Sequence, residues 1–213
     1  KDRKFHTQRL LAQLEGNGGL ANYDWIKLNP QRVGEAMARH AATIDELGRH
    51  LYSAEGHDVN LPGLLAWVRS MCEAGKRVVV IDPITAADTG EQPWEEEKRF
   101  VKDAQDVATR YGASVVLITH PRGGKRAGPP NMDDLAGGRS WVRFSDSVIW
   151  FNRPDKGTTF RVRDAMGIEA CIEPKVVLRL LKARHGKGGG CDIAYDWGDK
   201  LKYAEHGLIV GRE

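Results

Sequence analysis

The segment KRVVVIDP, residues 76–83, decides which fold this chain is expected to adopt. Its four branched apolar residues, 78–81, follow one another without alternation and stop at Asp82. This pattern is typical of a strand that is buried on both faces of a parallel sheet. Asp82 is then expected at the carboxyl end of the strand, which is the edge where open α/β sheets bind ligands.

A carboxylate at that edge suits a hydrated Mg²⁺ ion that bridges nucleotide phosphates. Magnesium keeps most of its waters and needs only one or two carboxylate contacts. Asp82 therefore has the form of a Walker B aspartate. The structural alternative is that Asp82 only caps the turn that follows the strand.

The overall composition indicates an ordinary globular domain. The chain has 213 residues, of which 41% are hydrophobic and 29% charged, and these values are typical of one α/β domain. The net charge of +3 is too small for a polycation, so contacts with nucleic acid would have to come from local clusters. Three widely spaced cysteines, Cys72, Cys171 and Cys191, indicate reduced thiols in a cytosol-like compartment, so a cytoplasmic location is expected. No apolar run approaches the roughly 18 residues of a membrane span, so no membrane partner is expected.

Apolar residues at helical spacing predict four helices. They cover residues 4–15, a segment from Pro30 to a break near Gly48, a segment from the cap Asn60 to Gly75, and a segment that ends at Gly112. The last helix lies between the apolar strands 78–81 and 114–119. Residues 77–119 are therefore expected to form a strand-helix-strand unit with two parallel strands.

The second half of the chain is predicted to be rich in β-structure. Residues 121–140 form a long loop of Gly, Pro and basic residues. The strands that follow are expected at residues 147–152, 158–163 and 176–182, with a terminal hairpin from residues 191–197 and 201–204. The predicted fold class is a single α/β domain over residues 1–213, with a mainly parallel central sheet flanked by helices and a β-rich carboxyl-terminal part.

The order of these features resembles the ATPase domain of the DnaB and Twinkle class of ring-shaped replicative helicases, which has a RecA-like core. The resemblance covers roughly residue 4 to residue 204 and is nearer to the phage and mitochondrial members. It rests on strands that end in Asp-Pro and in Thr-His-Pro, the segment DLAGGRSW at 134–141, a strand closed by Asn-Arg, and a strand closed by Lys-Ala-Arg-His-Gly at 182–186. The resemblance implies ATP and Mg²⁺ as cofactors.

The resemblance also implies roles for four catalytic residues. Asp82 would orient a water on the metal ion, and His120 would be the polar sensor of the γ-phosphate at the end of the next strand. Lys182 and Arg184 match a Lys-x-Arg pair that reaches the nucleotide of a neighbouring subunit. Such a cation offsets charge that accumulates on the transferring phosphoryl group.

A loop corresponds by the same resemblance to the one that faces the central channel of the ring. Its basic residues are Arg122, Lys125 and Arg126. Cations on such a loop can follow the phosphates of a single DNA strand without reading its bases.

Each assignment has an ordinary structural alternative. His120 could be a core histidine with its hydrogen bonds satisfied, and the three basic loop residues could form a solvated surface. Lys182 and Arg184 could be solvent-facing residues of a strand.

The sequence departs from the family pattern in one large respect. No G-x-x-x-x-G-K-[ST] segment occurs in the 213 residues, and the family's catalytic Glu would fall at or before Lys1. The chain is therefore interpreted as a piece that begins after the phosphate-binding loop and that is inactive alone. The alternative is a chain that kept the fold and lost the chemistry. Smaller departures are Ala136, Gly138 and His185.

The expected function is that of a motor domain in a hexameric DNA helicase of a phage or another mobile element. ATP hydrolysis between subunits of a homo-oligomeric ring would pull single-stranded DNA through it, with a primase or other replication proteins as further partners. Two alternatives stay open. One is a RecA-like accessory or regulatory DNA-binding module without its own ATP turnover, and the other is a RecA-family ATPase of plasmid replication or recombination.

Overall fold

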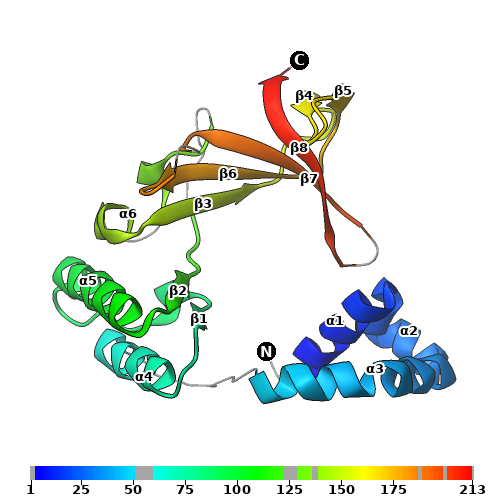
Figure 1. The fold of residues 1–213 in the computed structure, drawn as a ribbon, viewed down its shortest axis with the longest axis horizontal. Helices are drawn as coiled ribbons and strands as arrows, with labels where there is room; N and C mark the ends of the chain where they lie inside the picture. The colour runs from blue at the N-terminus through cyan, green and yellow to red at the C-terminus, as the bar shows by residue number, and fades with distance from the viewer. Residues whose placement is uncertain are drawn as a thin grey trace. The chain divides into compact units, whose positions relative to one another are not determined.

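The computed structural model has mixed α/β architecture and divides into two compact units (Figure 1). It describes residues 3–50, 60–121, 129–135, 139–186, 189–198 and 201–212. The first unit comprises residues 1–54, 151–179 and 191–213, and the second comprises residues 55–150 and 180–190.

The helices of the first unit form a small core of their own. They are α1 (Arg3–Glu15), η1 (Gly18–Ala21), α2 (Tyr23–Leu28) and α3 (Pro30–His50). Leu11, Leu20 and Ala36 are buried where α1, η1 and α3 meet. The helix predicted at residues 4–15 is confirmed, whereas α3 continues through Gly48, and η1 and α2 were not predicted. The side chain of Asn22 accepts hydrogen bonds from the backbone of residues 24 and 25 and so begins α2.

The second unit contains the predicted strand-helix-strand unit. Its elements are α4 (Leu61–Glu73), β1 (Val78–Ile81), η2 (Ile84–Ala86), α5 (Pro93–Tyr111) and β2 (Ser114–Leu117). β1 and β2 are parallel, with Val78 opposite Ser114 and Ile81 opposite Leu117. Asn60 caps α4 by accepting a 2.8 Å hydrogen bond from Gly63 N. Gly112, at φ 59°, ends α5 in the left-handed conformation that glycine adopts without strain.

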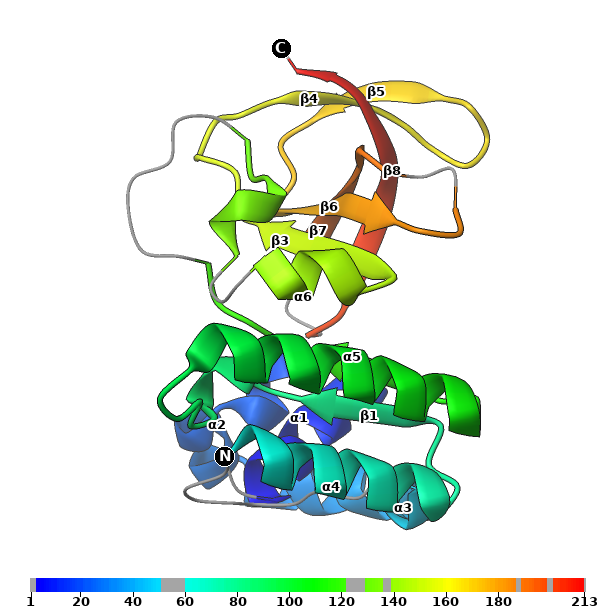
Figure 2. The ribbon, with the colours of Figure 1, turned by 90° about the vertical axis from the view of Figure 1, so that its left-hand side faces the viewer.

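One face of the β1–β2 sheet carries the core of this unit. Val79 and Ile81 are 3% and 7% exposed and pack in one cluster with Phe100 of α5. Both α4 and α5 lie on this side of the strands, as Figures 1 and 2 show. Val78 and Val80 point to the other side and are 63% and 50% exposed. The prediction that this strand is buried on both faces is therefore wrong for the described residues.

The remaining strands form a separate six-stranded antiparallel sheet. They are β3 (Ser147–Asn152), β4 (Phe160–Arg163), β5 (Glu169–Ile172), β6 (Val176–Ala183), β7 (Cys191–Trp197) and β8 (Tyr203–Arg212). Their order in the sheet is β3-β6-β7-β8-β4-β5, and β3 and β6 each run from one unit into the other. The β7–β8 hairpin was predicted, although β8 is longer than expected, and β5 was not predicted.

This topology corrects the expectation of one mainly parallel central sheet. Parallel neighbours need a long crossover, usually a helix, and among the described strands only β1 and β2 pair in this way across a helix. In the larger sheet, short turns join β4 to β5 and β7 to β8, and such turns impose antiparallel pairing on the two strands that they connect.

The segment between β2 and β3 has more structure than the predicted long loop. An isolated bridge pairs Pro121 with Leu135, and η3 (Met132–Asp134) is closed by a capping box with Asn131. A short helix, α6 (Arg139–Phe144), then leads into β3 and lies against α5. The ring centroids of Phe100 and Trp141 are 6.2 Å apart, and this contact joins the two helices.

Gly207 of β8 is a position that only glycine fits. Its φ is +124°, and a Cβ there would clash with the carbonyl oxygen of Arg163 on β4. Gly207→Ala is expected to lower the free energy of unfolding by at least about 2 kcal/mol, because strain and overlap act together. Urea denaturation would measure the loss. Gly211→Ala on the same strand is the matched control, since its Cβ would approach only the mobile end of Arg161, at 3.2 Å. Equal losses for the two variants would contradict the steric argument.

Candidate functional site

Asp82 and His120 lie at the same edge of the β1–β2 sheet. Parallel pairing continues past the strand ends, because Ile118 N donates to Ile81 O and Ile84 N donates to Ile118 O, both at 2.9 Å. Asp82 immediately follows β1, and His120 follows β2 by three residues. Both residues are exposed. The structure therefore brings these two predicted residues to one rim, and the alternative that His120 is a buried core histidine is excluded.

The segment after Asp82 is held in place at two points, Ile84 and Asp88. Ile84 is only 2% exposed and belongs to the core beneath β1. Further along, Asp88 O accepts a 3.3 Å hydrogen bond from Leu61 N at the start of α4, and the Asp88 carboxylate accepts one from Gly90 N at 3.1 Å. The loop thus begins from a fixed point, while the Asp82 carboxylate faces solvent.

One side chain at the rim, the Asp82 carboxylate, is of a type that binds Mg²⁺. Asp82 offers an exposed carboxylate oxygen, which is the ligand type that a hydrated magnesium ion takes from a protein. Among the described residues no group of three or more His, Cys, Asp or Glu side chains could hold a metal ion. Asp82 therefore offers one carboxylate oxygen at this rim, and a metal ion held there would need its other ligands from water or from a bound phosphate.

Lys182 is enclosed by the carboxyl end of α6. Its Nζ donates hydrogen bonds to Val142 O at 2.6 Å, Ser145 O at 2.8 Å and Arg143 O at 3.3 Å. These carbonyls belong to the last turn of the helix and the residue after it, where backbone oxygens lack helical partners. Burial lowers the pKa of Lys182, and the Arg184 guanidinium lowers it further. The ammonium group completes the carboxyl-terminal cap of α6.

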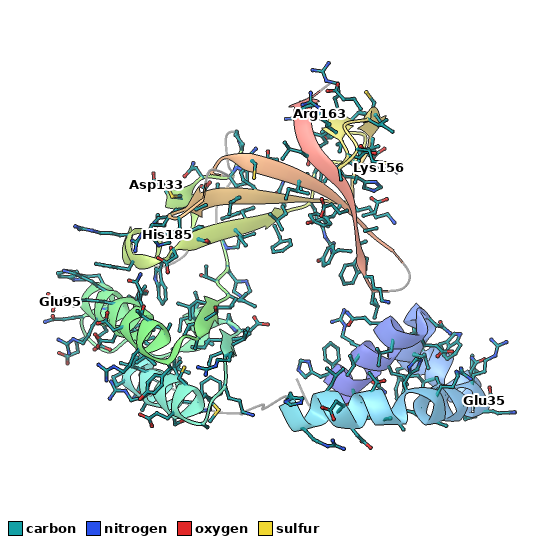
Figure 3. All side chains as sticks on the ribbon, in the orientation of Figure 1. Glu35, Glu95, Asp133, Lys156, Arg163 and His185 are labelled. Atoms are coloured by element: carbon teal, nitrogen blue, oxygen red, sulfur yellow. The ribbon has the colours of Figure 1, made fainter. Side chains whose placement is uncertain are left out.

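Arg184 is held by the same segment through different contacts. Its Nη1 donates to Asp146 Oδ1 at 3.1 Å, and its Nη2 donates to Arg143 O at 2.9 Å. Its backbone N donates to Asp146 O at 2.8 Å. Asp146 Oδ1 also accepts a 3.2 Å hydrogen bond from Gln105 of α5. His185 follows at the end of β6, beside α6 (Figure 3).

These contacts exclude a solvent-facing side chain for Lys182, whereas Arg184 is exposed as the structural alternative expected. The side chain of Arg184 is 37% exposed and that of Asp146 is 52% exposed, so their ion pair is open to water. Lys182 is more enclosed. The two members of the Lys-x-Arg pair therefore meet different surroundings although they are two residues apart.

The predicted DNA-contacting residues Arg122, Lys125 and Arg126 lie outside the described residues, as do Ala136 and Gly138. The described part between them includes Asp133, which Figure 3 labels. The roles of the three basic residues stay a prediction.

The contacts of Arg184 with Asp146 and Arg143, and that of Gln105 with Asp146, were not predicted. Asp146 and Arg184 are 38 positions apart, and Gln105 lies 41 positions before Asp146. The only signal in the sequence was the position of Asp146 directly before an apolar strand. No periodicity links these residues, because the sheet and α5 bring them together.

A search of protein-family models found no match to this chain. A search of curated proteins also found no significant match. Of the helices that the structure describes, none combines the length and apolar character that a membrane span requires. The geometry of the rim and of the Lys182–Arg184 region is therefore the basis for assigning a function.

Proposed function

We propose that this chain is the RecA-like ATPase part of a ring-shaped replicative DNA helicase. In the longer protein, ATP hydrolysis at subunit boundaries would be coupled to movement along single-stranded DNA and to duplex unwinding. The observation that carries the proposal is the parallel register of β1 and β2, which delivers Asp82 and His120 to one rim. Ligands bind at this edge in open α/β sheets.

Each rim residue has a role that suits its chemistry. Bound Mg²⁺-ATP would supply the transferable phosphoryl group and the metal charge that activates it. The Asp82 carboxylate would orient a metal-bound water and keep the metal beside the strand end. The His120 ring is a hydrogen-bonding group on the neighbouring strand and would respond to the presence of the γ-phosphate. Pro121, paired with Leu135, would connect that response to the loop after it.

Arg184 would act on the nucleotide of an adjacent subunit. Its guanidinium is partly exposed and has donors beyond the two that are used within the chain. An arginine that acts on the nucleotide of a neighbouring subunit (an arginine finger) requires head-to-tail interfaces between subunits. Such interfaces close into a ring when the rotation from one subunit to the next allows it. The proposal therefore includes a homo-oligomer, expected to be a hexamer.

The phosphate cradle must come from outside the 213 residues, because no G-x-x-x-x-G-K-[ST] segment is among them. One face of the β1–β2 sheet is apolar and exposed. Val78, Val80 and Val116 are 63%, 50% and 44% exposed, although parallel sheets ordinarily have both faces covered.

The decisive experiment is to read the residues encoded upstream of Lys1 and to assay the encoded protein for ATPase activity with and without single-stranded DNA. A phosphate-binding loop upstream, together with DNA-stimulated hydrolysis that Asp82→Asn abolishes, is the expected result. Hydrolysis that survives Asp82→Asn would count against the proposed role of the rim.

The second candidate is a RecA-like accessory or regulatory module that binds DNA without ATP turnover. The missing phosphate-binding sequence favours it. An encoded protein without such a loop, which binds single-stranded DNA but no nucleotide, would support this candidate in place of the motor.

The basic loop is expected to contribute phosphate contacts. Replacing Arg122, Lys125 and Arg126 by alanine should weaken binding to a labelled oligo(dT). If each residue contacts one phosphate, the slope of log K against log salt concentration should flatten by about 2. Fluorescence anisotropy over a series of salt concentrations would measure both effects.

The matched control for the loop variant is an equal loss of charge elsewhere. Lys98, Arg99 and Lys102 are exposed on α5. Their replacement by alanine should leave the salt slope unchanged. If the two triple variants flatten the slope equally, the loop has no special place on the DNA path.

A further inference from the structure

Lys182 and Arg184 meet different parts of one short segment. The segment runs from residue 143 to residue 146 and joins α6 to β3. The Lys182 ammonium caps the helix end, while the Arg184 guanidinium rests on Arg143 O and the Asp146 carboxylate. The two cations therefore share a support but are not equally available to a ligand.

The ammonium group of Lys182 is fully occupied. A lysine has three N–H donors, and the three carbonyl oxygens of Val142, Arg143 and Ser145 accept one each. Reaching an external phosphate would break these hydrogen bonds and leave helix-end carbonyls without their partner. Lys182 is thus suited to hold the segment rather than to leave it.

Among the described residues, the guanidinium of Arg184 uses only part of its hydrogen-bonding capacity. It has five N–H donors, and two of them are used in the contacts with Asp146 and Arg143. Both contacts come from the segment that Lys182 fixes. They orient the planar group, while the remaining donors are available to a phosphoryl oxygen. Gln105 adds a hydrogen bond to the same Asp146 oxygen and so ties the support to α5.

We propose that Lys182 is a positioning residue that acts through the segment 143–146 to orient the guanidinium of Arg184 toward an anionic phosphoryl group. Asp146 is a second positioning residue of the same kind. The phosphoryl group as ligand rests on the proposed function, whereas the orientation of Arg184 by Lys182 rests on the contacts alone. Arg184 is then the one catalytic member of the Lys-x-Arg pair.

The orientation of Arg184 can be tested on the 213-residue chain by arginine modification. Phenylglyoxal would be applied, and the rate at Arg184 would be compared with that at the exposed Arg153 by peptide mass spectrometry. Lys182→Met is expected to raise the Arg184 rate several-fold, because the guanidinium loses its fixed partners. Lys175→Met is the matched control, since Lys175 Nζ makes one hydrogen bond, to Trp197 O. An unchanged ratio in Lys182→Met would overturn the proposal.

Asp146→Asn is a second variant that tests the proposal even if Lys182→Met unfolds the protein. Asp146→Asn keeps the size of the side chain and removes its charge, so the segment should stay folded while the grip on Arg184 weakens. It should raise the Arg184 rate without changing the circular dichroism spectrum. A native spectrum together with an unchanged Arg184 rate would contradict the role given to Asp146.

ATPase assays of the encoded protein distinguish the positioning role of Lys182 from the proposed motor function. Lys182→Met should lower kcat and leave KM for ATP nearly unchanged, and the Lys182→Met, Arg184→Ala double variant should be no slower than Arg184→Ala. A further loss in the double variant would show that Lys182 acts independently and would overturn the proposal. Altered Arg184 reactivity in a protein that hydrolyses no ATP would support the positioning role and contradict the motor.

Discussion

Replacing Phe100 with alanine is expected to destabilise the second unit by about 3–5 kcal/mol, the usual cost of removing a buried aromatic side chain. Phe100 is 2% exposed and lies on the core face of α5, in the cluster that contains Val79 and Val68. It also contacts Trp141 and so helps to hold α6. The cavity would therefore loosen both the β1–α5 packing and the helix that supports Lys182.

Urea denaturation followed by circular dichroism would measure this loss. Trp94→Ala is the matched control, because Trp94 lies on the same helix but is 61% exposed. The control should change the free energy of unfolding by less than about 1 kcal/mol, as surface substitutions usually do. Similar losses for the two variants would mean that α5 does not pack on β1 as described.

Arg184→Ala is expected to reduce DNA-stimulated ATP hydrolysis in the encoded protein by at least about 10³-fold, the lower end of the range for arginine fingers. Nucleotide binding should remain nearly intact, because the guanidinium would stabilise charge that develops only while the γ-phosphoryl group passes from ADP to water at the neighbouring subunit's site. Steady-state ATPase assays and equilibrium binding of a fluorescent nucleotide would separate the two effects. Arg110→Ala, at the exposed end of α5, should leave both unchanged. Equal loss of binding and hydrolysis would contradict a finger.

Mixing two inactive variants tests whether the finger acts across a boundary. Asp82→Asn subunits keep Arg184, and Arg184→Ala subunits keep Asp82. In a mixed ring some boundaries combine an intact Asp82 with an intact Arg184, so part of the activity should return. If both residues serve the same subunit's nucleotide, the mixture stays as inactive as its components.

Local structure followed closely from the sequence. Asn60 caps α4 because its side chain reaches the backbone of Gly63, and Gly112 ends α5 because a left-handed residue is needed there. Phe100, Ala104 and Val107 recur at helical spacing along α5 and are buried. These features depend on neighbours a few positions away. The helix α6 was missed because it is only six residues long and follows a stretch rich in Gly and Pro.

The burial and direction of the strands were harder to predict. The run at residues 78–81 identifies a strand, but a run of branched apolar residues does not say what covers each face. α4 and α5 bury Val79, whereas Val78 and Val80 are exposed. Among the later strands, short turns join β4 to β5 and β7 to β8 as antiparallel pairs, so the sheet is antiparallel where a parallel one was expected.

For the candidate site, the sequence alone determined which residues end the strands: Asp82 after one apolar run and His120 after the next, with a Lys-x-Arg pair closing a third. Their common rim followed once a helix crossover made β1 and β2 parallel. Only the tertiary structure decided that Lys182 caps α6 and that Arg184 rests on Asp146. Those contacts join residues about 40 positions apart, which come together only through sheet pairing and helix packing. Local sequence patterns depend on residues a few positions apart, so they cannot predict such contacts.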